Sequence, residues 1–197
     1  MTKYSTATSG AAEALELYGW NAQVSAALMV PAHFAEVVTR NAVDEALTSV
    51  YGARWPWERS FEYSLPDPTR SYNPRRDLRK VRGREVTTGK VIAELKFVFW
   101  QSMFTSRHAG RVWDSRICAI FPNATQVTAG PLRQRIHDDL EHIRTLRNRI
   151  AHHEPLVTRN LADDLARMME LVQARSGETA DWLKTFEEAT ALVAARP

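Results

Sequence analysis

The sequence predicts an all-α fold, and three features of the 197-residue chain lead to that prediction. Apolar residues recur with helical spacing over most of the length. Few segments alternate between apolar and polar residues as strands do. Proline and glycine stand where helices are expected to begin and end. We therefore expect a bundle of about six or seven helices, with an irregular region that is rich in proline, aromatic and basic residues.

The first part of the chain predicts two helices and a long loop. Residues 11–30 are rich in Ala and Leu, and Pro31 suits the first position of a second helix that ends at Gly52. Residues 53–75 hold four prolines and five aromatic residues and follow no period. We expect an irregular loop anchored in the core by Trp55, Trp57 and Phe61, and base stacking is the alternative role for these rings.

The later helices are expected from their apolar periods and their caps. A helix that opens at Thr88 or Gly89 is apolar on all sides, which is typical of a central core helix or of one shared with a subunit interface. Cys118 is expected to be a small core residue. Thr128 and Pro131 suit the cap and first turn of a long helix, and Asn160 suits another cap. The other expected helices are 89–106, 108–121, 160–175 and 178–195, with a loop at 122–130, and the helix that follows this loop has His152 and His153 in its final turn or just beyond.

Composition indicates an ordinary globular protein, with 44% apolar and 25% charged residues. We expect one domain over residues 1–197. The chain lacks an apolar run of 18 residues, residues 1–20 lack the pattern of a signal peptide, and a single cysteine cannot form an internal disulfide. These features predict a cytoplasmic protein that makes no membrane contact.

Charge is unevenly distributed along the chain, although the net charge is only +3. Residues 67–90 hold eight basic and three acidic groups, whereas residues 1–50 and 160–197 are acidic. A concentrated basic segment indicates a surface that binds a polyanion such as RNA, and the alternative is a solvated loop without a partner. The residues predicted to bind RNA are Arg75, Arg76, Arg79, Lys80, Arg82, Arg84 and, further along the chain, Arg144.

The stretch IRTLRNRIAHHEP, residues 143–155, concentrates polar side chains at the end of a predicted helix. At 100° per residue, one arc holds an apolar stripe and a flank holds Arg144, Asn148 and His152. Arg147 falls beside the apolar stripe, 140° from His152, so it needs a groove or an acidic partner. Two copies of the helix about a two-fold axis would provide such a groove. The apolar stripe consists of Ile136, Leu140, Ile143, Leu146 and Ile150.

These residue types fit metal-free cleavage of RNA. A histidine can move protons at the ribose hydroxyl or the leaving oxygen, and an arginine can bind the phosphate through two hydrogen bonds. Structural alternatives remain open: an ion pair of Arg147 with Glu36 or Glu94, a helix-capping role for His152, and a hydrogen bond of Asn148 within the last turn. The adjacent histidines lack the spacing of a metal site, so we expect neither a metal nor another cofactor.

Arg147, Asn148 and His152 form a pattern that resembles the R-N-x-x-x-H signature of HEPN domains. Four segments follow in the order seen in the Abi-like (abortive infection) family: EVVTRNAVDEALTSVYGARW (36–55), ELKFVFWQSMF (94–104), VWDSRICAIFP (112–122) and LRNRIAHHEP (146–155). The resemblance implies an HEPN-like bundle that forms a homodimer, with a metal-independent site at the interface whose cleavage leaves a 2′,3′-cyclic phosphate.

Transferred to this chain, the resemblance implies that Arg147 and His152 are catalytic and that Asn148 is the polar residue between them. Glu36, Arg40 and Asn41 match a second polar cluster that supports the site, and His153 has no defined role beyond that of a neighbour. An ordinary surface pair is the alternative for Glu36 and Arg40, which are four residues apart.

The expected function is that of an endoribonuclease in a phage-defence or toxin–antitoxin system. Its expected partners are an RNA substrate, a second copy of the chain and an antitoxin, which is either a protein or an RNA. Two alternatives remain open: a non-catalytic HEPN dimer that binds RNA or protein, and a purely structural dimerisation domain.

Overall fold

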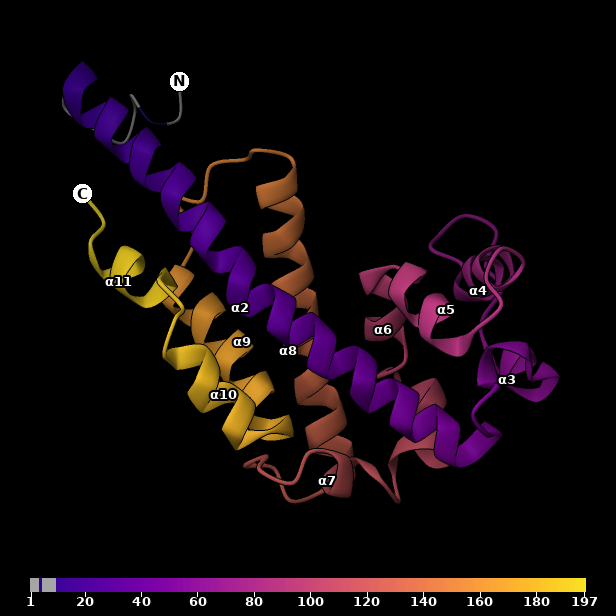
Figure 1. Ribbon diagram of the computed structural model, residues 1–197. Coiled ribbons are helices and arrows are strands. Elements are labelled where there is room, and N and C mark those ends of the chain that lie inside the picture. Colours follow the sequence, from indigo (N-terminus) through magenta and orange to yellow (C-terminus); the bar gives the residue numbers. More distant parts are fainter. Residues whose placement is uncertain (1–3, 5–9) are drawn as a thin grey trace. The chain divides into compact units, whose positions relative to one another are not determined.

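The computed structural model describes residue 4 and residues 10–197, and every regular element in this part of the chain is helical (Figure 1). The predicted all-α class is therefore confirmed. The elements are α2 (Ala11–Tyr51), η1 (Trp55–Trp57), α3 (Arg59–Ser64), α4 (Pro74–Arg82), α5 (Thr88–Glu94), α6 (Phe97–Ser102), η2 (Ser106–His108), the π-helical turn η3 (Ala109–Trp113), α7 (Ile117–Ile120), α8 (Ala129–Ala151), α9 (Leu161–Arg175), α10 (Gly177–Lys184) and α11 (Ala189–Ala194). The helices are more numerous than predicted, because several expected helices are divided.

The described residues group into two compact units. Unit 1 comprises the chain up to Ala35 and from Asp139 onward, and unit 2 comprises Glu36–Asp138. Helices α2 and α8 each contribute one part to unit 1 and the other part to unit 2. The expectation of one domain over residues 1–197 stays a prediction.

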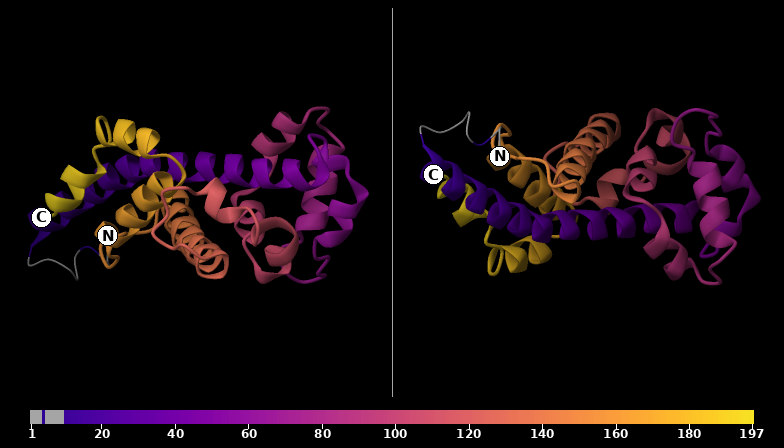
Figure 2. Two further views of the ribbon diagram at one scale, coloured as in Figure 1. Left: turned by 90° about the horizontal axis from the view of Figure 1, so that it is seen from below. Right: turned by 90° about the horizontal axis from the view of Figure 1, so that it is seen from above.

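Helix α2 runs without interruption through Pro31, so the prediction of two helices is wrong (Figure 2). A proline within a helix removes one backbone hydrogen bond and costs roughly 3 kcal/mol. Pro31 is buried, and Leu28, Ala32 and Ala35 around it are fully buried, so packing of this segment offsets the loss. Gly52, with φ of 81°, ends α2 as expected.

Three other predicted helices are broken. The helix expected over 108–121 consists of the π-helical turn η3 and the short helix α7. The helix expected over 89–106 consists of α5 and α6, which are separated by extended backbone at Leu95 and Lys96. The break allows Leu95, Phe97 and Trp100 all to be buried, although they would point to different sides of one continuous helix. The helix expected over 178–195 is likewise divided into α10 and α11.

The region expected to be an irregular loop contains short helices instead. Residues 53–75 include η1, α3 and the first turn of α4, with Glu58 as the cap of α3 and Asn73 as the cap of α4. Trp55 and Phe61 are fully buried anchors, as predicted, whereas Trp57 is half-buried. Residues 65–73 do form an irregular loop.

The core of unit 2 is built largely from aromatic rings. Trp55 makes edge-on contacts with Phe61 and Trp100, and Phe104 stacks on Trp113 with ring centroids 4.5 Å apart. The indole N–H of Trp113 donates to the carbonyl of Met103 at 2.7 Å. Cys118 is exposed, so its predicted place in the core is wrong, because the short helix α7 turns this position outward.

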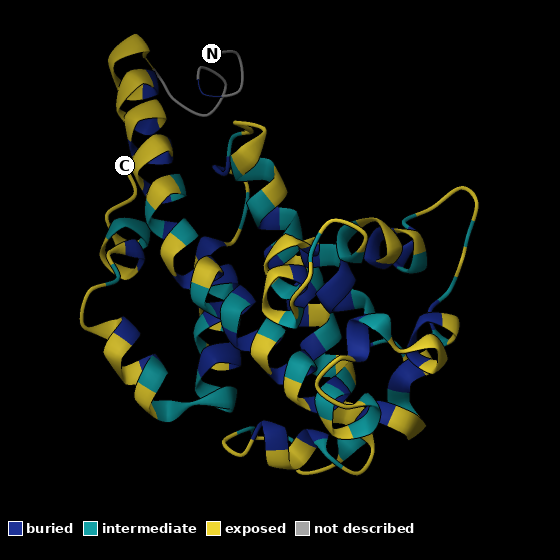
Figure 3. Ribbon diagram, turned by 45° about the vertical axis from the view of Figure 1, so that its right-hand side comes forward, coloured by how far each residue is buried: buried dark blue, intermediate teal, exposed yellow. Residues whose placement is uncertain are grey.

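Unit 1 is built from α9, with α10 and α11 packed against it, together with parts of α2 and α8. Buried positions recur every three or four residues along the long helices (Figure 3). Asn160 caps α9 by accepting the backbone N–H of Asp163, as predicted. The indole of Trp20 on α2 donates to the carbonyl of Leu192 on α11 at 2.7 Å.

Within the described part of the chain, none of the helices is both long and apolar enough to cross a membrane. The prediction on a signal peptide concerns residues 1–20, of which 1–3 and 5–9 lie outside the described residues.

Candidate functional site at the end of helix α8

The end of α8 is closed by a Schellman motif. The N–H of His153 donates to the carbonyl of Ile150 at 3.0 Å, and the N–H of Glu154 donates to the carbonyl of Arg149 at 2.8 Å. This pair of bonds requires a left-handed residue between them, and His153 takes that place with φ of 55°. His152 is therefore the C-cap residue that follows Ala151, the last residue of α8, and the chain turns sharply immediately after it.

Side chains of unit 1 hold the segment that follows this turn. Arg149 lies 3.4 Å from the Glu154 carboxylate and donates to the Pro155 carbonyl at 3.1 Å. The N–H of Leu156, itself fully buried, donates to the Asn21 side chain at 2.8 Å. The helix end is thus supported by both its own last turns and α2.

A second set of hydrogen bonds holds the same loop further along the chain. Arg159 donates to the His142 carbonyl at 3.1 Å and to the carboxylate of Asp164 at 2.7 Å, and Asp164 is only 3% exposed. Charge-assisted contacts of this kind orient the loop firmly. The candidate residues therefore stand at the end of a well-supported helix.

The predicted faces of α8 are largely confirmed. Ile136, Leu140, Ile143 and Leu146 are buried, and Ile150 at the end of the stripe is half-buried. Asn148 and His152 are exposed, one turn apart, and the N–H of His152 donates to the Asn148 carbonyl at 3.0 Å. Their side chains therefore lie on one accessible face.

Arg144 and Arg147, two of the three arginines in residues 143–155, have different surroundings. Arg144, on the same flank as Asn148, is half-buried and pairs with Glu141 at 2.5 Å. Arg147 is also half-buried, and its position in the helix places it on a different face from His152. One copy of the helix thus presents Asn148 and His152 together, with Arg147 turned away from them.

The predicted supporting residues belong to unit 2. Glu36 and Arg40 form an ion pair one turn apart on α2, and the Glu36 residue is only 7% exposed. Arg40 also approaches the carbonyl of Ala93 at 3.4 Å, whereas Asn41 is exposed. The pair expected from the spacing is therefore present, with a buried rather than a surface carboxylate.

Half of the predicted RNA-binding cations in the basic segment make structural contacts inside unit 2. Arg75 donates to the carbonyls of Glu62, Tyr63 and Leu65, the last at 2.6 Å. Arg79 and Arg82 both pair with the Glu62 carboxylate. Burial alone would raise the pKa of Glu62, but hydrogen bonds and charge from the two arginines outweigh it, so the pKa lies below its usual value. The exposed cations of the set are Arg76, Arg79, Lys80 and Arg84, and of these Arg79 pairs with Glu62.

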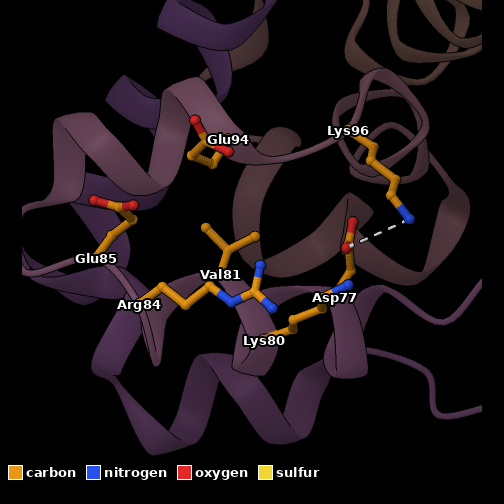
Figure 4. Close-up of a pocket in the computed structure, with 7 residues that line it drawn as sticks. All are labelled: Asp77, Lys80, Val81, Arg84, Glu85, Glu94 and Lys96. Carbon is orange, nitrogen blue, oxygen red and sulfur yellow. Dashed lines mark ion pairs between the residues drawn. The ribbon is translucent and has the colours of Figure 1, made fainter.

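A pocket of about 140 Å³ opens beside this segment (Figure 4). Lys80, Arg84 and Lys96 line it together with three carboxylates, those of Asp77, Glu85 and Glu94. Lys96 lies 3.8 Å from Asp77, as the dashed line in Figure 4 marks. Because charges of both signs line the pocket in equal number, it offers no net attraction to an anion.

Sequence patterns did not single out a second group of basic residues, Arg107, His108 and Arg111. In the sequence they appear as three basic side chains within five positions, at the start of the helix expected over 108–121. The structure places them on η2 and η3 around a larger pocket of unit 2.

Among residue 4 and residues 10–197, no group of three His, Cys, Asp or Glu side chains lies close enough to hold a metal ion. Comparisons with known proteins found no matching family model, no matching curated protein and no matching solved structure. The resemblance to the Abi-like family and the roles that it implies therefore stay predictions from the sequence.

Proposed function

We propose that this chain is a metal-independent endoribonuclease of a phage-defence or toxin–antitoxin system, which cuts RNA at a site formed by two copies of the α8 end. The observation that carries the proposal is the exposed pair Asn148 and His152 on a helix end that unit 1 holds firmly. The four ordered segments that resemble the Abi-like family support the same function.

The proposed chemistry follows from the side chains. His152 takes the proton from a ribose 2′-hydroxyl, whose oxygen then attacks the adjacent phosphorus. The bond from phosphorus to the 5′-oxygen breaks, a histidine returns a proton to that oxygen, and a 2′,3′-cyclic phosphate remains. A guanidinium stabilises the charge on the phosphate oxygens, and Asn148 orients the phosphate or the imidazole.

A second subunit is part of this proposal because of the position of Arg147. Within one helix, Arg147 and His152 lie about 140° apart around the axis. Two copies related by a two-fold axis bring the arginine of one helix toward the histidine of the other. Purified protein is expected to have about twice the chain mass of 22.4 kDa by light scattering, and a strictly monomeric protein would contradict the composite site.

Cleavage provides the direct test. Purified protein is expected to cut RNA in EDTA, and His152→Ala is expected to cut about 10²- to 10⁴-fold more slowly, the range that acid–base catalysis contributes. His142→Ala is the matched control, because His142 is an exposed histidine on the same helix outside the motif. Gel analysis of fragment ends should detect the cyclic phosphate. Equal cleavage by wild type and His152→Ala would remove His152 from the mechanism.

A non-catalytic HEPN dimer that binds RNA is the second candidate, and the exposed Arg76, Lys80 and Arg84 favour it. It predicts salt-dependent RNA binding without product. Growth of cells that express the protein separates the two: the nuclease is expected to arrest growth, and the double change Arg147→Ala, His152→Ala to relieve the arrest.

A further inference from the structure

A polar pocket of unit 2 has a volume of about 520 Å³. Tyr51 at the end of α2, Tyr63 and two serines of α3, and the turns η2 and η3 form its walls. This volume lies within the range of sites that hold small ligands. None of these residues belongs to the α8 motif, so the pocket is separate from the site of the proposed nuclease.

The charge of the pocket lining is entirely positive. Arg107 and Arg111 contribute two guanidinium groups, and no aspartate or glutamate lines the pocket. Arg107 is held at the wall by a bond from Nη1 to the Ser64 carbonyl at 3.2 Å. The Arg111 side chain forms no hydrogen bond or ion pair with another described residue, so its five N–H donors remain available.

Two further polar groups of the lining are buried. His108 is 3% exposed, and burial, with a smaller contribution from the Arg107 charge, lowers its pKa to about 4. It is therefore neutral near pH 7, with one N–H donor and one acceptor. The Tyr51 hydroxyl is buried and has no hydrogen-bond partner within the described chain. A buried hydroxyl without a partner is uncommon in native proteins, and a bound water, ion or ligand can satisfy it.

The backbone beneath these side chains is also unusual. The N–H of Asp114 donates to the carbonyl of Ala109 at 2.9 Å, five residues earlier, which makes η3 a π-helical turn. Single π-helical turns are rare and occur frequently at functional sites. The turn carries Arg111 into the same lining as Arg107 and His108.

One wall is suited to a flat group. The Tyr63 side chain is exposed, at 56%, and the Arg75 guanidinium lies 5.6 Å from its ring centroid. Aromatic rings of this kind stack on nucleobases with little sequence preference. The pocket thus combines phosphate-binding donors with an adjacent ring.

We propose that this pocket binds a small phosphate-bearing molecule of nucleoside-monophosphate size, with the phosphate between Arg107 and Arg111 and the Tyr51 hydroxyl as a further donor. Planar guanidinium groups match phosphate oxygens in pairs, which ammonium groups do not. The base of such a ligand lies against Tyr63.

Calorimetric titration of the full chain with AMP tests the proposal. AMP is expected to bind with a Kd below about 1 mM, and Arg111→Gln to weaken binding at least about tenfold, which is about 1.4 kcal/mol. Tyr51→Phe removes one hydroxyl and is expected to weaken binding about 3- to 10-fold, as the loss of one hydrogen bond does. Arg59→Gln is the matched control, because Arg59 is an exposed arginine of α3 outside the lining.

Two further probes define the ligand. Adenosine, which lacks the phosphate, is expected not to bind. Inorganic phosphate is expected to bind more weakly than AMP, and equal affinity would assign the site to the phosphate group alone. The proposal is overturned if AMP shows no binding at about 5 mM, or if Arg111→Gln, with unchanged thermal stability, binds AMP as wild type does.

Discussion

The backbone of His153 has φ of 55°, in the left-handed region that residues with a Cβ adopt at a cost of about 1 kcal/mol or more. Glycine normally stands at this place in a Schellman motif. Among the described residues other than glycine, His153 alone has a positive φ. The chain therefore holds a strained residue directly beside the exposed His152, which is typical of functional positions.

Replacing His153 by glycine should release this strain. We expect His153→Gly to raise the free energy of unfolding by about 0.5–1 kcal/mol, because glycine adopts positive φ readily. Denaturation in urea measures the change. His152→Gly is the control: it stands at the helix end without a positive φ and should give no gain. A loss of stability in His153→Gly would show instead that the imidazole stabilises the folded state.

Individual residues with local roles were predictable. Asn160 caps α9 and Gly52 ends α2, because a cap depends on hydrogen bonds to residues a few positions away. Asn148 and His152 share one face of α8 because helical spacing alone determines it, and the structure leaves both residues exposed. Cys118 was wrongly assigned to the core, since burial depends on which segments cover a position.

At the scale of elements, Glu62 joins α3 to α4. Its carboxylate is buried and pairs with Arg79 and Arg82, and the Arg82 guanidinium also donates to the Pro56 carbonyl at 2.8 Å. Two arginines predicted to bind RNA thus hold the short helices of unit 2 together. Sequence spacing could not reveal this, because Glu62 lies 17 and 20 residues before its partners.

Removing the Glu62 charge should destabilise the protein. We expect Glu62→Gln to lower the free energy of unfolding by about 3 kcal/mol, the lower end for a broken buried pair, because Arg79 is half exposed and can reach water. Asp181→Asn is the control, since Asp181 pairs with Lys184 at the surface, where such pairs contribute less than about 1 kcal/mol.

The lowered pKa of Glu62 predicts that the stability of the protein depends on pH. The pKa of Glu62 is lowered in the folded protein, so its pair stabilises the fold above the pKa of the unfolded chain. This stability is expected to be lost as the pH falls below that value and through the folded pKa. The free energy of unfolding, measured between neutral and acidic pH, should therefore depend less steeply on pH in Glu62→Gln than in wild type. The same pH profile in both proteins would contradict the ion pairs assigned to Glu62.

At the scale of the whole molecule, a net charge of +3 conceals a basic segment in which structural contacts engage half of the six cations predicted to bind RNA. Arg75, Arg79 and Arg82 contact carbonyls or Glu62, whereas Arg76, Lys80 and Arg84 are exposed and do not pair with Glu62. Binding of RNA through this segment thus rests on three charges instead of six.

Replacement of Arg76, Lys80 and Arg84 by glutamine should weaken RNA binding and its salt dependence. With about 0.7 counterions released per phosphate on single-stranded RNA, the slope of log K against log salt is expected to fall by about 2. The matched control replaces Arg54, Arg59 and Lys184, three exposed cations outside the basic segment, by glutamine. Equal slopes for the triple variant and wild type would exclude the segment as an RNA surface.

The chain's own pattern of residues determined the all-α class, the caps at Gly52 and Asn160, and the exposed polar face at the end of α8. These features follow from helical periodicity and from hydrogen bonds between near neighbours, which any folded arrangement preserves. Only the tertiary structure decided that α2 continues through Pro31, that the helix over 89–106 breaks at Leu95, and that Glu62 engages two arginines. The tertiary structure alone also brought Tyr51, Arg107 and Arg111 together around one pocket. Burial and charge pairing arise between residues that are distant in the sequence, so local patterns do not predict them.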